Sequence, residues 1–204
     1  MQLVYNPGMT TLDKSYAYEE LLMVHDGTKI EEISLPKGYA LANHALDYKE
    51  DWCKMMLQHG MFFSEQEVQD YWNKMVQQNA AFLDQNFFIA LDAQGNMAGA
   101  AGLWPGTHFG RESMRLHYLA VDEAHQNRGL ATALVIHALN VHQQRSRDPL
   151  YLSTQAQSWP AIVLYEKLGF HPWMEQTAFC SKEQSAAAWN KAKSLVYEKE
   201  KVWI

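Results

Sequence analysis

The sequence predicts an α/β fold of the α+β type, in which a mixed, mostly antiparallel central sheet of about six or seven strands is flanked by helices. Two observations predict this fold. A hairpin lies in the middle of the chain, where the apolar segments Phe87–Leu91 and Met97–Trp104 enclose turn residues. In the second half of the chain, extended and helical segments alternate, which is typical of strands that are joined by helices.

The N-terminal part of the chain is predicted to be an extension of the main domain. We place the extension at residues 1–38 and the main domain at residues 39–204. Within the extension, Tyr18–His25 fits either a helix or a strand, and Lys29–Leu35 alternates as a strand does. Tyr39–His44 is predicted to be the first strand of the main domain.

Two helices are predicted next. Leu46–His59 has apolar residues on one face and ends at a glycine, as helices often do. Ser64 and Glu67 form a capping-box pattern that opens the second helix. The hairpin follows, and Met114–Val121 then alternates as a further strand.

The remaining elements are predicted from periodicity and from helix-end signals. They are a long helix at Gly129–Arg145, a strand at Leu150–Thr154, a helix at Ser158–Leu168 with Pro160 in its first turn, a strand that starts at Phe170, a helix at Ser181–Lys193 and a final strand at Leu195–Trp203. Hydrophobic residues make up 48% of the 204 residues, so a packed core is expected.

Composition narrows the classes of function. The formal net charge is −6 and no segment is dense in Lys and Arg, so a nucleic-acid partner is not expected. No apolar run is long enough to cross a bilayer, and residues 1–8 lack the pattern of a signal peptide. Cys53 and Cys180 are interpreted as reduced thiols. A cytoplasmic location without membrane attachment is expected by elimination.

The most informative segment is Leu119–Leu134, where a strand ends, a polar loop turns and a helix begins at Gly129. Backbone N–H groups in such a loop, together with the positive end of the helix, suit a pyrophosphate. Gly129 permits close approach of the backbone, Arg128 adds charge and Thr132 adds a hydroxyl. The alternative is a plain strand-to-helix connection that binds nothing.

A second motif, Ala161-x-x-Leu164-Tyr165-Glu166-Lys167-Leu168-Gly169-Phe170, follows the first at the expected distance. Together with Gln126-x-x-Gly129-x-Ala131, it resembles the two signatures of the GNAT superfamily of N-acetyltransferases. The order of strands and helices from about residue 38 is also similar to the fold of that family. The resemblance implies a transferase that uses acetyl-CoA as its co-substrate and needs no metal.

The resemblance also implies which residues bind coenzyme A. Leu119 and Val121 would bind the pantetheine arm through their backbones, and the loop would hold the pyrophosphate. The family often has an Asn where this sequence has Ser158, whose shorter hydroxyl would do part of that work or would cap the helix. The full set of expected cofactor-binding residues is Leu119, Ala120, Val121, Gln126, Asn127, Arg128, Gly129, Leu130, Ala131, Thr132, Ser158 and Ala161.

The expected chemistry is direct attack of a neutral amine on the thioester. Since an alkyl amine has a pKa of about 10.4, a base must take its proton. The candidate is His117, which faces the same side of its strand as Leu119, and Glu112 is a weaker alternative. The Leu119 N–H is the candidate donor to the oxyanion, and Tyr165 is the candidate acid for the thiolate. Without catalysis, His117 would be a half-buried hydrogen-bonding residue and Tyr165 a core aromatic residue.

Three functions remain open. The first is acetyl transfer to a primary amine of a small molecule; the second is acetylation of protein N-termini or lysine side chains. The third, from another class, is a non-catalytic acyl-CoA sensor or interaction module. His137 and His142 are five residues apart on one helix, which does not suit a metal pair. A homodimer is an expectation that comes from the family resemblance alone.

Overall fold

The structure is a computed structural model, and it describes residues 17–200. The expectation about the first eight residues, and the end of the final strand predicted at 195–203, lie outside the described residues. Within them, seven strands form a sheet with the order β2-β3-β4-β5-β6-β1-β7. The pairs β2–β3, β3–β4, β1–β6 and β1–β7 are antiparallel, and the pair β5–β6 is parallel. The prediction of a mixed, mostly antiparallel sheet with flanking helices is confirmed.

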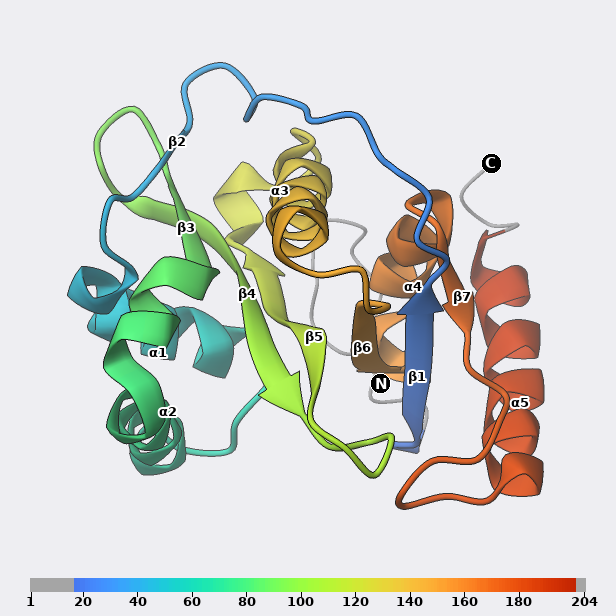
Figure 1. The fold of residues 1–204 in the computed structure, drawn as a ribbon. Helices are drawn as coiled ribbons and strands as arrows, with labels where there is room; N and C mark the ends of the chain where they lie inside the picture. Colours follow the sequence, from blue (N-terminus) through green and yellow to red (C-terminus); the bar gives the residue numbers. More distant parts are fainter. Residues whose placement is uncertain (1–16, 201–204) are drawn as a thin grey trace, which may run out of the picture. The chain divides into compact units, whose positions relative to one another are not determined.

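Figure 1 shows the elements in the colours of the sequence. In chain order they are β1 (Glu20–His25), β2 (Ala40–Leu41), the 3-10 helix η1 (Ala45–Tyr48), α1 (Lys49–Gln58), α2 (Glu65–Asn86), β3 (Phe87–Leu91), β4 (Met97–Gly106), β5 (Ser113–Val121), η2 (Glu123–His125), α3 (Leu130–Arg145), β6 (Tyr151–Gln155), η3 (Ala156–Ser158), α4 (Trp159–Lys167), β7 (Phe170–Pro172) and α5 (Lys182–Glu200).

The chain forms two compact units that interleave along the sequence. Unit 1 holds Glu31–Leu103 and Tyr118–Asn140. Unit 2 holds Trp104–His117 and the described parts of Asp13–Ile30 and Val141–Ile204. Strand β5 has residues in both units, because its residues up to His117 belong to unit 2 and those from Tyr118 belong to unit 1.

In unit 1, α2 begins at the predicted capping box. The Ser64 hydroxyl accepts a hydrogen bond from the Glu67 N–H at 3.2 Å. The Glu67 carboxylate in turn accepts from the Phe63 N–H at 2.8 Å. The local pattern therefore defines this helix start, as expected. The helix continues to Asn86 with a kink at Asn79, whose φ of −166° and ψ of 88° are not helical.

Aromatic rings form the centre of unit 1. The rings of Trp52 and Trp72 lie 5.0 Å apart, and Tyr118 of β5 lies edge-on to Trp52 at 5.2 Å. Tyr118 has a φ of 52°, in the left-handed region that non-glycine residues avoid. Its contacts with Trp52, Phe62 and Tyr71 hold this conformation in place. The pleat of β5 is therefore broken immediately before Leu119.

Two glycines of β4 allow close packing in unit 1. A Cβ atom at Gly99 would lie 3.0 Å from the Ala120 carbonyl oxygen and 3.2 Å from a methyl group of Val121. A Cβ atom at Gly102 would lie 2.6 Å from the ring of Phe87. A side chain at either position would therefore force its neighbours to shift, which glycine avoids.

In unit 2, β1 lies between β6 and β7 and pairs antiparallel with both. Tyr18–His25, which fitted a helix or a strand, is therefore a strand at Glu20–His25. These residues fall in the part of the chain that the sequence assigned to an extension. Helix α5 packs on β1, where the buried Trp189 donates its indole N–H to the Leu22 carbonyl oxygen at 3.1 Å.

Three sequence predictions are wrong. Lys29–Leu35 forms no strand, and its residues from Glu31 to Ser34 are exposed, so neither face of the alternation packs on a core. The predicted final strand is helical as far as Glu200, because α5 continues past Lys193. The strand predicted at Tyr39–His44 is shortened to Ala40–Leu41.

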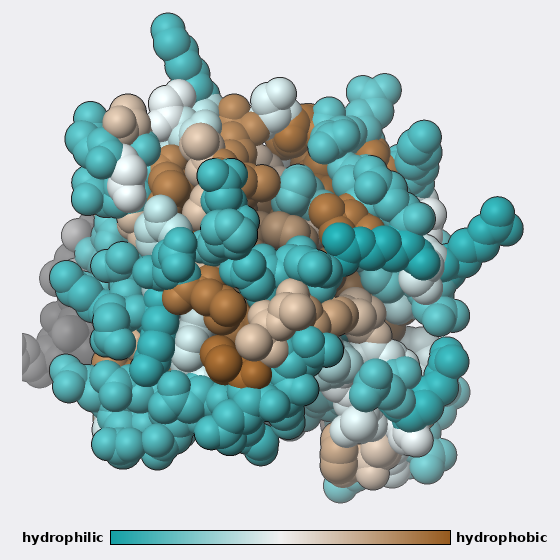
Figure 2. All heavy atoms as spheres, turned by 60° about the vertical axis from the view of Figure 1, so that its left-hand side comes forward, coloured by the Kyte–Doolittle hydropathy of each residue, from teal (hydrophilic) through white to brown (hydrophobic). Residues whose placement is uncertain are grey.

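The surface offers no large apolar area on the face drawn in Figure 2, which is mainly hydrophilic with small separate hydrophobic groups. The exposed large hydrophobic residues among the described residues are Tyr18, Ile33, Phe63 and Phe179. Within residues 17–200, none of the helices combines the length and the apolar character that crossing a bilayer requires.

Candidate functional site

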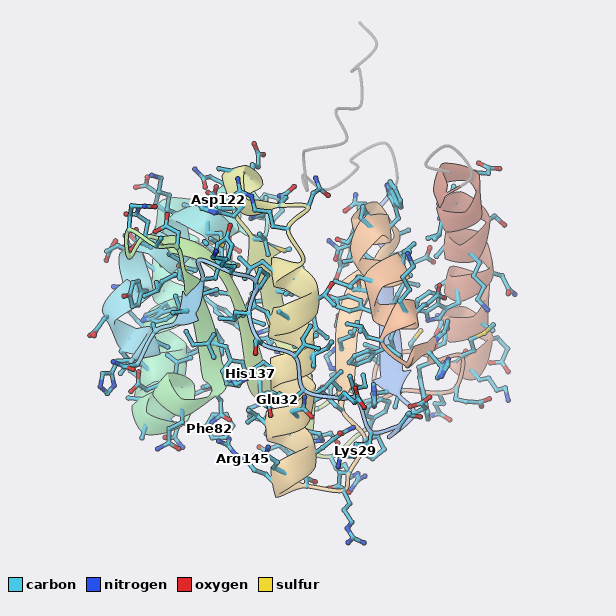
Figure 3. The ribbon with its side chains drawn as sticks, turned by 90° about the horizontal axis from the view of Figure 1, so that it is seen from above. Lys29, Glu32, Phe82, Asp122, His137 and Arg145 are labelled. Atoms are coloured by element: carbon cyan, nitrogen blue, oxygen red, sulfur yellow. The ribbon has the colours of Figure 1, made fainter. Side chains whose placement is uncertain are left out.

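The loop after β5 lies in unit 1 and is fixed at its start by Asp122. The Asp122 N–H donates to the Ala98 carbonyl oxygen at 2.9 Å, and its carboxylate accepts from the Ala124 N–H at 2.9 Å. Figure 3 labels Asp122 at this turn, where η2 begins. The carboxylate is thus used to cap η2.

The loop then reverses direction through two left-handed residues. Asn127 has a φ of 58° and Gly129 has a φ of 79°. Asn and Gly are the residues that adopt this conformation most readily. The Gln126 side chain anchors the loop to the end of β5 by donating to the Val121 carbonyl oxygen at 3.1 Å. Helix α3 starts directly afterwards at Leu130.

The start of α3 suits an anion. The Ala133 N–H donates to the Gly129 carbonyl oxygen at 3.0 Å, whereas the N–H groups of the first turn have no intrahelical acceptor. No acidic residue lies in that first turn. The space over Gly129 is open, because the nearest side-chain atom to an added Cβ would be Pro36 Cγ at 3.9 Å. The loop therefore fits a diphosphate, because its N–H donors suit an anion and the space over Gly129 is open.

A polar chain of side chains in unit 1 holds Arg128. The Arg128 Nη1 donates to the Tyr39 hydroxyl at 3.2 Å, and this hydroxyl lies 2.9 Å from His125 Nδ1. The guanidinium can only donate, and the tautomer of His125 decides which partner donates in the bond between His125 and Tyr39. The other ring nitrogen of His125 is 3.9 Å from an Asp92 carboxylate oxygen. Sequence analysis missed Tyr39 and His125, which carry no motif that marks them.

The other predicted cofactor residues of unit 1 contribute mainly backbone or small side chains. The side chains of Ala120, Val121 and Leu130 are buried, so any contact of these residues with a ligand would come from backbone groups. Those of Leu119, Ala131 and Thr132 are half-buried.

Ser158 and Ala161 belong to unit 2, at the start of α4. Ser158 is the residue before the helix, but its hydroxyl makes no capping hydrogen bond. The alternative that Ser158 caps α4 is therefore wrong. Pro160 occupies the first turn of the helix as predicted, and Ala161 follows it as a half-buried residue.

Tyr165 lies on α4 and is buried, with 8% of its surface exposed. Its ring lies edge-on to Phe170 at 5.8 Å. Burial raises the pKa of the Tyr165 phenol above its ordinary value, because the phenolate would be poorly solvated. The phenol is therefore protonated at neutral pH, which is the form that a general acid needs.

His117 lies on the part of β5 that belongs to unit 2. Burial lowers the pKa of His117 well below its usual range, and the charge of Arg115 lowers this pKa further. Arg115 Nη2 lies 3.4 Å from His117 Nε2. Because the guanidinium donates, Nε2 accepts, and the proton of the neutral ring is on Nδ1. Glu112, the weaker candidate base, is exposed in the loop before β5.

A polar cluster surrounds Arg115 in unit 2. The Glu20 carboxylate accepts from the Ser153 hydroxyl at 2.6 Å and lies 3.2 Å from His108 Nε2. His108 Nδ1 is 2.9 Å from the hydroxyl of the buried Tyr151. Arg115 and Tyr151 are register partners in the parallel pair of β5 and β6. Sequence analysis did not find this cluster.

The two histidines of α3 have separate partners. His137 is labelled on α3 in Figure 3, and its ring lies edge-on to Phe88 at 4.6 Å. His142 Nε2 lies 2.8 Å from the Asp148 carbonyl oxygen. Throughout residues 17–200, no three His, Cys, Asp or Glu side chains are grouped so as to hold a metal ion.

The sequence matches the family model described as the acetyltransferase (GNAT) family over residues 50–170. It is 27% identical over 144 residues to a mycothiol acetyltransferase of Clavibacter sepedonicus, which covers 70% of the chain and 46% of that relative. It is also 39% identical over 56 residues to the ribosomal protein bS18-alanine N-acetyltransferase of Escherichia coli K12, which covers 28% of the chain and 38% of that relative. The matched region thus spans less than half the length of these curated relatives.

Solved structures show the same fold. A GCN5-related N-acetyltransferase from Sphaerobacter thermophilus matches with a TM-score of 0.59 and 18% identity, over 79% of this chain and 52% of that one. An acetyltransferase of the GNAT family from Staphylococcus aureus matches with a TM-score of 0.54 and 18% identity, over 65% of this chain and 84% of that one.

Proposed function

Because the chain belongs to the acetyltransferase (GNAT) family, we propose that it transfers an acetyl group from acetyl-CoA to a primary amine of a small molecule. Acetyl-CoA would supply the activated acyl group as a thioester. The residues that would hold its diphosphate are those of the loop from Gln126 to Thr132. Leu119 and Val121 would bind the pantetheine arm through their backbones, and Ser158 and Ala161 would contact it from α4.

The observation that carries this proposal is the start of α3. Asn127 and Gly129 both adopt the left-handed conformation, which turns the loop so that a helix start follows it directly. The first turn of α3 has no carboxylate that would repel an anion. The polar chain through Tyr39 and His125 holds Arg128 beside this loop. A plain strand-to-helix connection would need none of these features.

In the proposed reaction, three groups of the chain act on the reacting atoms. His117 accepts the proton of the attacking amine, and the Leu119 N–H donates a hydrogen bond to the oxyanion. The left-handed conformation of Tyr118 supports this use of the Leu119 N–H, since it interrupts the regular pleat of β5 immediately before Leu119. Tyr165 donates a hydrogen bond and then a proton to the leaving thiolate.

The buried environment of Tyr165 supports its role as an acid. A phenol with a raised pKa remains protonated at neutral pH, so it still carries the proton that it would donate to the thiolate. Burial also raises the pKa of a thiol. Within this protein, burial raises the pKa of the Cys53 thiol to about 11. A thiolate formed in buried surroundings is therefore a better proton acceptor than one in water.

The test is a panel of amine acceptors with acetyl-CoA, in which release of free thiol is followed. We expect amine-dependent thiol release by the wild-type protein. We expect Tyr165→Phe to lower kcat by about 10²- to 10⁴-fold, which is the usual contribution of a general acid. Calorimetry should give the same Kd for coenzyme A in both proteins. Equal kcat values would remove Tyr165 from the mechanism, and binding without thiol release for any amine would favour an acyl-CoA sensor.

Acetylation of a protein α-amine is a second candidate. The similarity to the E. coli enzyme that acts on an alanine of a ribosomal protein favours it. Short peptides in the same panel distinguish the two candidates, because a protein acetyltransferase should gain kcat/KM as the peptide grows beyond its first residue. A small-molecule enzyme should lose it.

A further inference from the structure

Arg115 is a half-buried cation without a carboxylate partner. Within residues 17–200 it makes no ion pair within 4.0 Å, and its hydrogen bond goes to the neutral ring of His117 at 3.4 Å. Its Nε is buried without a hydrogen-bond partner. Taking a guanidinium partly out of water without a counter-charge is costly, so such a group is typically completed by an anion.

The neighbouring carboxylate does not serve as this anion. Glu20 accepts hydrogen bonds from Ser153 and His108. The His108 hydrogen bond is the main reason why the pKa of Glu20 lies below its ordinary value, and Arg115 contributes least among the causes. Both hydrogen bonds go to Oε1 of Glu20. Glu20 is therefore ionised, lies outside ion-pair distance of Arg115 and adds one negative charge near the guanidinium.

Resting on the proposed function, we propose that the amine acceptor carries a carboxylate and that Arg115 binds it. Arginine and carboxylate have matching planar geometries, and their hydrogen bonds are charge-assisted. A monoanion fits better than a phosphate dianion, because Arg115 is one positive charge and Glu20 lies beside it. The acceptor class is thus that of amino acids and related amino carboxylates.

Binding of the carboxylate also changes His117. In the free protein, Arg115 occupies the lone pair of His117 Nε2. A carboxylate that draws the guanidinium to itself releases this nitrogen, which can then take the proton of the amine. The correct acceptor would thereby activate its own base, and Arg115 would act both as a binding residue and as a positioning residue.

The test compares matched pairs of amines that differ in the carboxylate alone, such as glycine with glycinamide and β-alanine with β-alaninamide. We expect the wild-type protein to prefer the carboxylate by about 10- to 100-fold in kcat/KM, which is typical of a charged hydrogen bond. Arg115→Gln should abolish this preference, and Arg115→Lys should keep part of it. Arg147→Gln, at an exposed arginine of the same unit, should leave the preference unchanged.

A second measurement does not depend on turnover. Calorimetry with N-acetylglycine and N-acetylglycinamide should show tighter binding of the carboxylate to the wild-type protein, and equal binding of both to Arg115→Gln. Equal binding of both by the wild-type protein, or amines accepted equally well with and without the carboxylate, would overturn the inference. Selective carboxylate binding without thiol release from any amine would refute the proposed function and leave the Arg115 site in place.

Discussion

At the scale of single residues, the proposed chemistry depends on how each group is solvated. Tyr165 and His117 are ordinary residue types whose environments shift them in opposite directions. Burial raises the pKa of the phenol and lowers that of the imidazole, because in each case the charged form is poorly solvated. Both groups are therefore neutral at pH 7, so one can give a proton and the other can take one.

The charge of Arg115 is the second cause of the low pKa of His117, after burial. We therefore expect Arg115→Gln to raise the pKa of His117, while burial still keeps it below the ordinary value of about 6.5. An NMR titration of the His117 ring measures this directly. Arg147→Gln is the matched control and should not move the pKa. A His117 pKa that is the same in both variants would show that the charge of Arg115 does not reach the ring.

At the scale of elements, Gly129 matters because it helps to shape the loop between β5 and α3. The prediction of this element from a strand end, a polar loop and a glycine is borne out by the strand β5, the turn and the helix α3. Its detailed shape comes from the two left-handed residues, Asn127 and Gly129.

Gly129→Ala separates backbone strain from ligand binding. Gly129 has a φ of 79°, and an added Cβ would meet only Pro36 Cγ, at 3.9 Å. Gly95, in the turn between β3 and β4, has a φ of 85°, and an added Cβ there would have no atom within 4 Å. Each substitution should lower the free energy of unfolding by about 1 kcal/mol, measured in urea, because alanine disfavours this conformation. Gly129→Ala alone should weaken coenzyme A binding. If Gly95→Ala weakens it equally, the loop is not the binding site.

At the scale of the whole molecule, three histidines oppose folding in acid. The pKa values of His25, His117 and His137 are all lowered, in each case mainly by burial. Below pH 6.5 the unfolded chain takes up protons that the folded protein takes up less readily. Stability is therefore complete above the unfolded pKa and is lost as the pH falls toward the folded values.

We expect the free energy of unfolding, measured in urea, to fall between pH 7.5 and pH 5.5. His25 is buried, and its Nδ1 accepts from the Gly27 N–H at 3.1 Å. His25→Gln should make the acid-induced loss smaller. His44 is the control, because it is exposed and its bond to Asp84 raises its pKa, so His44→Gln should not reduce the loss. A pH-independent stability would show that the buried histidines do not govern it.

Local patterns were sufficient for most of the elements but not for all. The Ser64 capping box and the run of residues that ends in Gly169 are short-range signals, and the structure follows them. The strand predicted at Lys29–Leu35 does not form, because alternation predicts a strand only where a partner strand is available. The end of α5 was predicted too early. Its buried stripe, Ala188, Ala192 and Val196, continues past the predicted end.

By itself, the sequence determined the fold class, the family and the loop before α3, because these depend on residue types and spacings within short segments. Only the tertiary structure decided that β1 lies between β6 and β7, and that Glu20 meets Ser153, which is 133 positions away. It likewise decided that Arg115 donates to the imidazole of His117, with Glu20 nearby but outside ion-pair distance. Such features arise where distant segments pack together, and the burial and charge that they create are properties of that packing.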